Sequence, residues 1–199
     1  MSKENADKEQ KRSFKREAFS WIACIVVTIL LTEFILNFVI INANIPSGSM
    51  ENTIMTNDKL IALRTSYWFN DPKRGDIIIF KYPDDETEWF IKRVIALPGE
   101  TVLVKDGKVY INGSKKALSE PYIKEEPVED FGPYKVPKNG YFVMGDNRNN
   151  SNDAREWETH YVSRDEVLGK AWFSYREGRT ISGVKTKHVK TFAKLKAGR

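Results

Sequence analysis

The chain of 199 residues is 30% charged, with a formal net charge of +5 that belongs to its two ends, because residues 20–175 carry 18 basic and 22 acidic side chains. Since this middle portion shows no basic face with interleaved aromatic residues, the charge excludes nucleic acid as an expected partner. The single cysteine excludes an intrachain disulfide and a cysteine metal cluster. The only two histidines, His160 and His188, are far apart in the sequence, which argues against a Ser-His-Asp triad. We expect neither a metal nor another cofactor.

Residues 1–19 are charged and poor in large apolar side chains, which predicts a mobile tail. Residues 20–41 read SWIACIVVTILLTEFILNFVII, and a helix of this length spans about 33 Å, enough for a bilayer core of about 30 Å. We therefore expect a transmembrane anchor at residues 20–41. Glu33 and Asn37 are costly within it, and Glu33 is protonated, paired or close enough to the interface to reach water.

A cleaved signal peptide is the alternative interpretation of this segment. The apolar run is longer than a typical signal-peptide core, and no small-x-small site follows it directly, so a retained anchor is favoured. Lys11, Arg12, Lys15 and Arg16 flank its amino end. The positive-inside rule then predicts a cytoplasmic amino terminus and a single-pass protein of the plasma membrane, with everything after residue 41 outside the cytoplasm.

The rest of the chain is expected to be mainly β. Short Ile-rich or Val-rich runs bounded by turn signals predict antiparallel strands and one Asp-Gly hairpin, at residues 58–63, 75–81, 89–97, 101–105, 108–112, 141–144 and 169–175. Residues 113–139 hold four of the eight prolines and predict a long surface excursion. Tyr67-Trp68-Phe69 either covers the core or dips into the membrane interface. The basic end, residues 176–199, is expected to be a solvated tail or to contact anionic lipid.

Pro46-Ser47-Gly48-Ser49-Met50 follows the apolar segment, with Ser49 eight residues beyond it. Serines beside Gly and Pro are usually turn residues, so this motif alone proves little. A nucleophile at this position would meet a substrate whose own apolar segment lies in the same bilayer. We therefore treat Ser49 as a candidate nucleophile.

Lys92 lies within the apolar run WFIKRVIAL and shares a strand face with Phe90, Val94 and Ala96. It is either a lysine that reaches solvent at a strand edge or one that is buried for a purpose. Burial disfavours the ammonium, and lowering its pKa from about 10.4 to about 7.5 costs about 4 kcal/mol. A neutral amine could take the proton from Ser49, as in Ser-Lys variants of activated-serine chemistry.

A polar loop, GDNRNNSNDAR at residues 145–155, follows a short apolar strand. It is either a turn braced by ion pairs or part of a site built on the sheet. Four segments in this order resemble bacterial type I signal peptidases of the single-anchor, Gram-positive kind: PSGSM at 46–50, GDIIIF at 75–80, FIKRVIALPGE at 90–100 and the polar loop. The resemblance runs from the anchor to about Tyr175.

The resemblance implies a catalytic domain at residues 42–175, with a fold shared with self-cleaving SOS repressors and a variable β extension at about 105–138. It implies that Ser49 is the nucleophile, Lys92 the general base, and Ser47 with the Ser49 N–H the oxyanion hole. Ser151 would orient the lysine, while the remaining matched residues support the site loop, namely Arg93 with Asp146 and Asp153 with Arg155. The substrates would be secretory preproteins with small residues at the first and third positions before the cut.

Two positions depart from the family pattern. Asn52 stands where proline is usual and is expected to loosen the loop after the nucleophile, and Ala154 stands where serine is frequent. Two other functions stay open: a Ser-Lys peptidase that cleaves its own chain, and an inactive tethered β-domain that binds exported chains or wall polymer.

Overall fold

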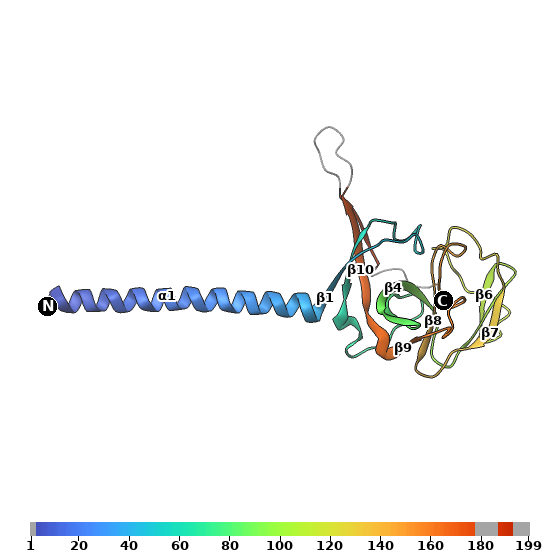
Figure 1. Cartoon of the computed structure of the whole chain (residues 1–199), viewed down its shortest axis with the longest axis horizontal. Coiled ribbons are helices and arrows are strands. Elements are labelled where there is room, and N and C mark those ends of the chain that lie inside the picture. The colour runs from blue at the N-terminus through green and yellow to red at the C-terminus, as the bar shows by residue number, and fades with distance from the viewer. Residues whose placement is uncertain (1–2, 178–186, 193–199) are drawn as a thin grey trace, which may run out of the picture. The chain divides into compact units, whose positions relative to one another are not determined.

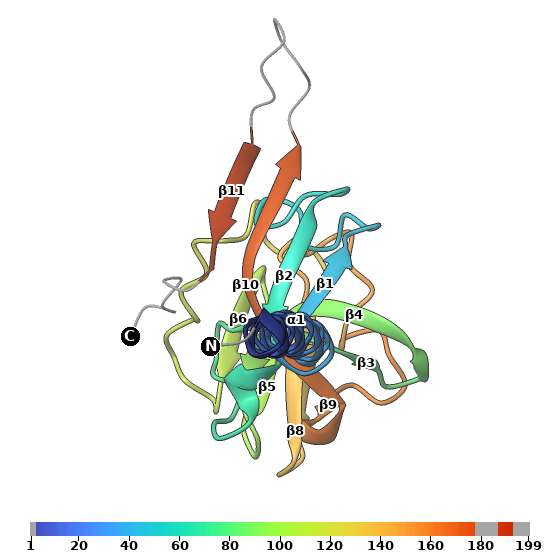
Figure 2. The ribbon, with the colours of Figure 1, turned by 90° about the vertical axis from the view of Figure 1, so that its left-hand side faces the viewer.

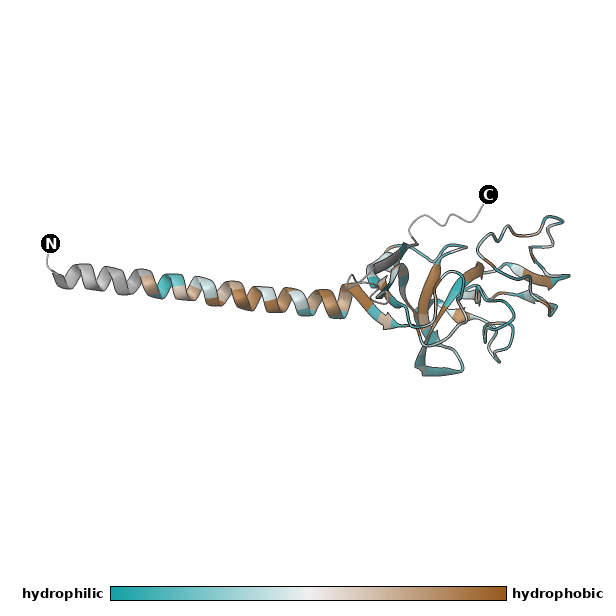
Figure 3. Cartoon of the chain, turned by 90° about the horizontal axis from the view of Figure 1, so that it is seen from above, coloured by the Kyte–Doolittle hydropathy of each residue, from teal (hydrophilic) through white to brown (hydrophobic). Residues whose placement is uncertain are grey.

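The computed structural model describes residues 3–177 and 187–192 and divides into an amino-terminal helical unit and a β unit that begins at Ile40. Helix α1 covers Lys3–Phe34 and is followed by a π-helical turn at Ile35–Val39 (Figure 1). The segment Phe14–Val39, 26 residues, is long and apolar enough to cross a membrane. Figure 3 shows apolar residues predominating along its second half.

The helical unit differs from the sequence prediction at both ends. The chain is helical from Lys3, where a mobile tail was expected, because residues 3–19 are rich in the helix formers Lys, Glu, Gln and Ala. Helical structure ends at Val39, and the predicted last residues of the anchor, Ile40 and Ile41, belong to a strand instead. Glu33 accepts hydrogen bonds from the Asn37 amide at its carbonyl (2.9 Å) and at its carboxylate (3.0 Å). These two costly polar groups thus satisfy each other.

Most of the described strands form one antiparallel sheet in the order β1-β2-β10-β3-β4-β8-β9 (Figures 1 and 2). Strands β1, β2 and β3 cover Ile40–Asn44, Lys59–Leu63 and Ile77–Tyr82. The other members are β4 (Asp85–Ala96), β8 (Gly140–Met144), β9 (Val162–Ser163) and β10 (Val167–Glu177). The mainly β, antiparallel fold expected from the sequence is confirmed.

Strand β4 is paired unevenly along its length. It pairs with β3 on one side from Asp85 to Arg93, with Lys92 opposite Ile78. On its other side β8 pairs only with residues from Arg93 to Ala96. Among the described strands, the half of β4 before Arg93 therefore keeps one edge without a partner.

A second sheet has the strand order β6-β5-β7, and of its strands β6 and β7 lie within the expected variable extension whereas β5 directly precedes it. Strands β5 (Thr101–Lys105) and β6 (Lys108–Ile111) form the hairpin expected from Asp106-Gly107, whose residues have positive φ angles of 50° and 74°. Strand β7, Phe131–Lys135, was not expected in the stretch interpreted as a surface excursion. Its internal Pro133 and its mostly exposed side chains leave no strand signal in the sequence.

Two buried clusters form the core. The larger one joins both sheets and includes Trp157, which packs against the rings of Phe80, Tyr82 and Phe90. Tyr67 belongs to this cluster and so covers the core, whereas Trp68 and Phe69 are exposed. Contact of these two rings with the membrane interface stays a prediction. The smaller cluster lies under the loop that carries Ser49: Ile41, Ile45, Met50, Ile54, Leu60, Ala62, Ile77, Ile79, Ala171 and Phe192.

The basic end also differs from the expected free tail. Residues 187–191 form strand β11, Lys187–Thr191, which pairs antiparallel with β10, and Phe192 is buried. The expectation for residues 178–186 and 193–199 lies outside the described residues. The described part of the basic end is thus a component of the fold.

Candidate active site

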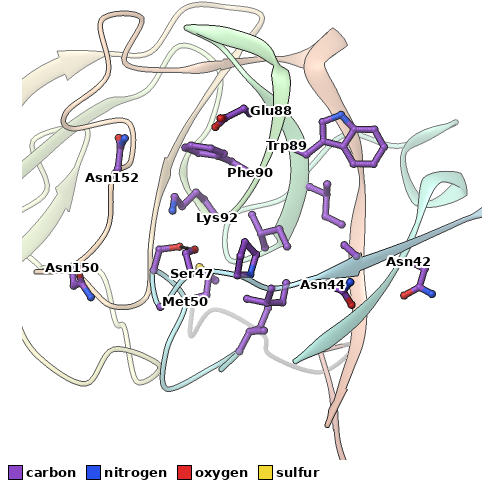
Figure 4. Close-up of a pocket in the computed structure, with 18 residues that line it drawn as sticks. Asn42, Asn44, Ser47, Met50, Glu88, Trp89, Phe90, Lys92, Asn150 and Asn152 are labelled. Carbon is purple, nitrogen blue, oxygen red and sulfur yellow. Dashed lines mark hydrogen bonds between the residues drawn. The ribbon is translucent and has the colours of Figure 1, made fainter. Parts of the chain in front are cut away.

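A pocket of about 710 Å³ lies between the chain leading to Ser49 and the first half of β4 (Figure 4). Glu88, Phe90 and Lys92 follow one another along β4 in Figure 4, as expected from the alternation of side chains in a strand. The opposite wall comes from β1 and the turn after it. The lining residues are Asn42 to Met50, Ile54, Ile79, Glu88 to Lys92, Asn150 and Asn152.

Ser49 lies in a tight turn at the base of this pocket and is 8% exposed. The Glu51 N–H donates to the Gly48 carbonyl at 3.0 Å, and Asn147 holds the same turn through two further bonds. Its N–H donates to the Ser49 carbonyl (3.1 Å) and its side-chain amide donates to the Gly48 carbonyl (3.0 Å). The backbone of the candidate nucleophile is therefore fixed by the polar loop 145–155.

The hydroxyl oxygens of Ser47 and Ser49 lie 3.4 Å apart, and either can donate. Among the described residues, the Ser49 hydroxyl forms a hydrogen bond only with the Ser47 hydroxyl, and it forms none with the Lys92 amine. The Ser49 N–H has no hydrogen-bond acceptor within the described ranges. The Ser47 hydroxyl and the Ser49 N–H thus belong to the same turn as the Ser49 oxygen, and both are kinds of donor from which oxyanion holes are built.

Lys92 is 4% exposed although its amine faces the pocket. Its Nζ lies 5.5 Å from the centre of the Phe90 ring. Burial lowers the pKa of Lys92 from 10.5 to about 8, against the opposing attraction of the Asp153 carboxylate. Near neutral pH an appreciable fraction of this lysine is therefore an uncharged amine, able to accept a proton.

Gly145 explains how the polar loop approaches Ser49. A Cβ added at this position would collide with the Ser151 hydroxyl and with the Ser49 carbonyl oxygen. The Ser151 hydroxyl is buried and has no hydrogen-bond partner among the described residues. Only glycine permits this close approach, which places Ser151 beside the turn that carries Ser49.

Two buried ion pairs support the loop. The Arg93 guanidinium donates to both carboxylate oxygens of Asp146, at 2.7 and 2.6 Å, and the Thr53 hydroxyl donates to the same carboxylate. Asp153 accepts from Arg155 at 2.8 and 2.9 Å and from the Gly145 N–H at 2.9 Å. These bonds connect the strand of Lys92, the polar loop and the turn after Ser49.

Sequence reasoning missed a second layer of supporting residues. The Tyr122 ring stacks 3.9 Å from the Arg93 guanidinium carbon, and Arg148 forms a buried bidentate pair with Glu120 at 2.9 and 2.7 Å. Both Glu120 and Tyr122 lie in the variable extension, where the sequence shows only an irregular polar stretch. No sequence signal relates them to a loop so distant along the chain.

Asn52 does not loosen the loop as expected. Its φ of 81° lies in the left-handed region, which proline cannot adopt, and its side-chain amide donates to the Tyr122 carbonyl at 2.9 Å. Ala154 is fully buried, and its carbonyl oxygen lies 2.8 Å from Nδ1 of His160. The His160 ring packs against the rings of Phe131 and Tyr134.

Comparison with known proteins identifies the family. Residues 18–176 match the family described as signal peptidase, peptidase S26. The chain is 46% identical over 158 residues to signal peptidase I of Leptolyngbya laminosa, covering 75% of each chain. It is 37% identical over 177 residues to signal peptidase I of Bacillus licheniformis, covering 84% of this chain and 93% of that one.

A crystal structure of a signal peptidase I from Enterococcus faecalis is 36% identical, with a TM-score of 0.44, and matches 51% of this chain and 97% of that chain. The family match spans both walls of the pocket and the polar loop. The alignments with the two relatives cover most of the length of each relative. The chain belongs to the signal peptidase family, peptidase S26, and its curated relatives are signal peptidases I.

Proposed function

We propose that this protein is a membrane-anchored serine endopeptidase that removes amino-terminal signal peptides from exported preproteins, with Ser49 as nucleophile and Lys92 as general base. The observation that carries the proposal is the burial of Lys92, which lowers its pKa to about 8 on the wall of the pocket that contains Ser49. A buried amine without a structural ion pair costs stability, and a role as a base accounts for its presence.

In the first step, the Ser49 hydroxyl gives its proton to the neutral Lys92 amine while its oxygen bonds to the carbonyl carbon of the scissile peptide. The resulting oxyanion accepts hydrogen bonds from the Ser49 N–H and the Ser47 hydroxyl. The carbon–nitrogen bond then breaks, and Lys92 returns the proton to the leaving amine of the mature protein. Water, deprotonated by Lys92, hydrolyses the ester and releases the signal peptide carboxylate and free Ser49.

Catalytic hydrogen bonds frequently tighten only when the substrate binds. The absence of a bond between Ser49 and Lys92 in the free protein is therefore compatible with this mechanism. Ser151 is buried beside the turn, and its hydroxyl bonds to none of the described residues. It is proposed to orient the Lys92 amine once the site closes around the substrate. Arg93, Asp146, Asp153 and Arg155 are proposed to support the site without touching the substrate.

The edges of β1 and β4 support binding of an extended substrate. Among the described strands β1 pairs only with β2, and β4 pairs before Arg93 only with β3, so each strand keeps one free edge there. Both strands line the pocket. A peptide between them can add main-chain hydrogen bonds to either edge. Since alternate side chains of a strand point the same way, its first and third residues before the cut would face the enclosed wall together, which favours small residues there.

We propose further that Phe14–Val39 anchors the protein in the plasma membrane, with the amino terminus in the cytoplasm and the β unit outside. The hydropathy of this segment and the basic residues before it support the anchor and the orientation. Ser49 follows the segment by ten residues in the sequence, which supports cleavage near the bilayer surface. External protease added to intact cells should digest the β unit, and protection of that unit would reverse the orientation.

The decisive assay mixes the full chain in detergent with an excess of one preprotein. The parent should release the mature protein, whereas Ser49→Ala and Lys92→Met should each fail, and Lys105→Met, at an exposed lysine, should cleave at the parental rate. A parent that leaves the preprotein intact would support the binding alternative, and one that cuts only its own chain would support self-cleavage. Parental rates for Lys92→Met would refute the dyad.

A further inference from the structure

Strand β11 lies beyond the family-matched segment, which ends at residue 176. It pairs with β10 from Phe173 to Glu177, and Figure 2 shows the two strands side by side. Strand β3 occupies the same edge of β10 only from Val167 to Lys170. The described carboxyl-terminal residues therefore extend the central sheet at a place that β3 leaves open.

Phe192 anchors this strand beneath the candidate active site. It is 7% exposed and belongs to the buried cluster that contains Met50 and Ile54. Its N–H donates to the Trp172 carbonyl on β10 at 2.9 Å. Because Met50 directly follows Ser49, the Phe192 ring helps to form the floor on which the nucleophile turn rests.

Lys190 bonds directly to that turn. Its amine donates to the carbonyl oxygens of Asn52 (3.2 Å) and Thr53 (3.3 Å). The same two residues also bond to other parts of the fold. The Asn52 side-chain amide donates to the Tyr122 carbonyl, and the Thr53 hydroxyl donates to the Asp146 carboxylate. The turn after Ser49 is therefore held from three directions: by the polar loop, by the variable extension and by the carboxyl-terminal strand.

We infer that Lys190 and Phe192 are positioning residues for Ser49, because their two side chains hold the turn that carries it. This inference rests on the proposed function. The direction of the Ser49 hydroxyl and N–H depends on the backbone of residues 48–54, because both groups belong to that turn. A small displacement there separates the nucleophile and the oxyanion donor from the carbonyl carbon, which lowers the rate of the chemical step more than it weakens substrate binding.

The first test measures preprotein cleavage by the full chain in detergent. Lys190→Met keeps the apolar stem and removes the donor, so kcat should fall about tenfold with KM within about twofold. Lys190→Arg should recover most of kcat because it restores a donor. The matched control is Thr191→Val, an exposed residue of the same strand, which should leave both constants unchanged.

A parental kcat for Lys190→Met, or a change confined to KM, would overturn the inference. The midpoint of the pH–rate profile should stay at the parental value in Lys190→Met, because Lys92 is untouched; a shifted midpoint would assign the effect to the base instead. Removing the whole ring of Phe192 can unfold the unit, so the second variant is Phe192→Leu, which should remain folded and also lose kcat.

The second test does not depend on activity. Hydrogen exchange of the peptide covering residues 50–56 should be faster in Lys190→Met than in Thr191→Val, because the Thr53 and Ile54 amides bond within this turn. Equal exchange would overturn the inference. If the parent and Ser49→Ala both fail to cleave the preprotein, the proposed function fails, and this measurement still decides whether the strand holds the turn.

Discussion

The Arg93 guanidinium holds the Asp146 carboxylate through two hydrogen bonds of 2.7 and 2.6 Å, and both side chains are almost completely buried. Arg93 directly follows the proposed base, and Asp146 belongs to the loop that fixes Ser49. The pair thus sets the separation between the two segments that provide the proposed dyad.

Asp146→Asn should destabilise the protein by about 3 kcal/mol, because it leaves the buried guanidinium without its counter-charge. The control is Glu86→Gln, which removes one partner of the exposed Lys81 pair and should cost less than about 1 kcal/mol. Chemical denaturation in detergent measures both. Equal stabilities of the two variants would show that the buried pair does not hold the site.

Cleavage should depend on pH through Lys92. Since burial lowers its pKa to about 8, the rate should rise with pH as the ammonium loses its proton, with a midpoint near 8 in the profile of kcat/KM. A profile from pH 6 to about 10 measures this midpoint. A rate that stays constant over this range would exclude Lys92 as the base.

Lys92→Met should make the protein more stable while abolishing cleavage. The folded state binds the Lys92 proton less tightly than the unfolded state, because burial lowers the pKa from 10.5 to about 8. Lys92 therefore lowers the free energy of unfolding by about 3 kcal/mol below pH 8, and this destabilisation disappears as the pH rises from 8 to 10.5. The gain of Lys92→Met over the parent should therefore be largest at pH 7. Thermal unfolding in detergent at pH 7 and 10.5 measures it, and a destabilised variant at pH 7 would contradict the assignment.

Ser151→Ala should lower the cleavage rate without lowering stability. The Ser151 hydroxyl is buried and has no hydrogen-bond partner within residues 3–177 and 187–192, so its removal breaks no hydrogen bond with that part of the protein. If it orients Lys92 in the complex with substrate, kcat should fall at least about tenfold. The measurements are the cleavage rate and the unfolding temperature of Ser151→Ala, each compared with the parent. Full activity of Ser151→Ala would show that this residue does not belong to the proposed site.

Gly145→Ala should lose both activity and stability, because its Cβ would force the Ser151 hydroxyl and the Ser49 carbonyl apart. Gly113→Ala is the control: its positive φ of 68° gives backbone strain, but its surroundings are open. That control should cost about 1 kcal/mol and leave the cleavage rate unchanged. Comparable activities of the two variants would show that the close approach at Gly145 is unimportant.

The strands could be predicted where local sequence decides them. The Ile-rich run before Lys81 and the Asp-Gly hairpin have both the composition and the turn residues of strands, and both are strands in the structure. Strands β7 and β11 could not be predicted, because one contains Pro133 and the other lies in a basic segment, and each is stabilised by pairing with a distant strand.

The site shows the same division. Ser49 could be proposed because it closely follows an apolar segment, Lys92 because it lies within an apolar strand, and both because their motifs resemble those of a known family. The support from Tyr122, Glu120 and Lys190 depends on contacts between residues far apart in the chain, which no local pattern encodes. Asn52 is the clearest example, because its sequence position suggests a weaker turn whereas its contacts tie the turn to the extension.

Among the described strands, one edge of β4 has no partner before Arg93, and this open edge carries a hazard as well as an opportunity. A strand edge that can receive a passing polypeptide can equally receive the same edge of another copy, and such pairing leads to aggregation. The hairpin that opens this edge is acidic and exposed, with Asp84, Asp85, Glu86 and Glu88 close together. Two copies meeting there would repel each other through these like charges, which opposes pairing of this edge with itself.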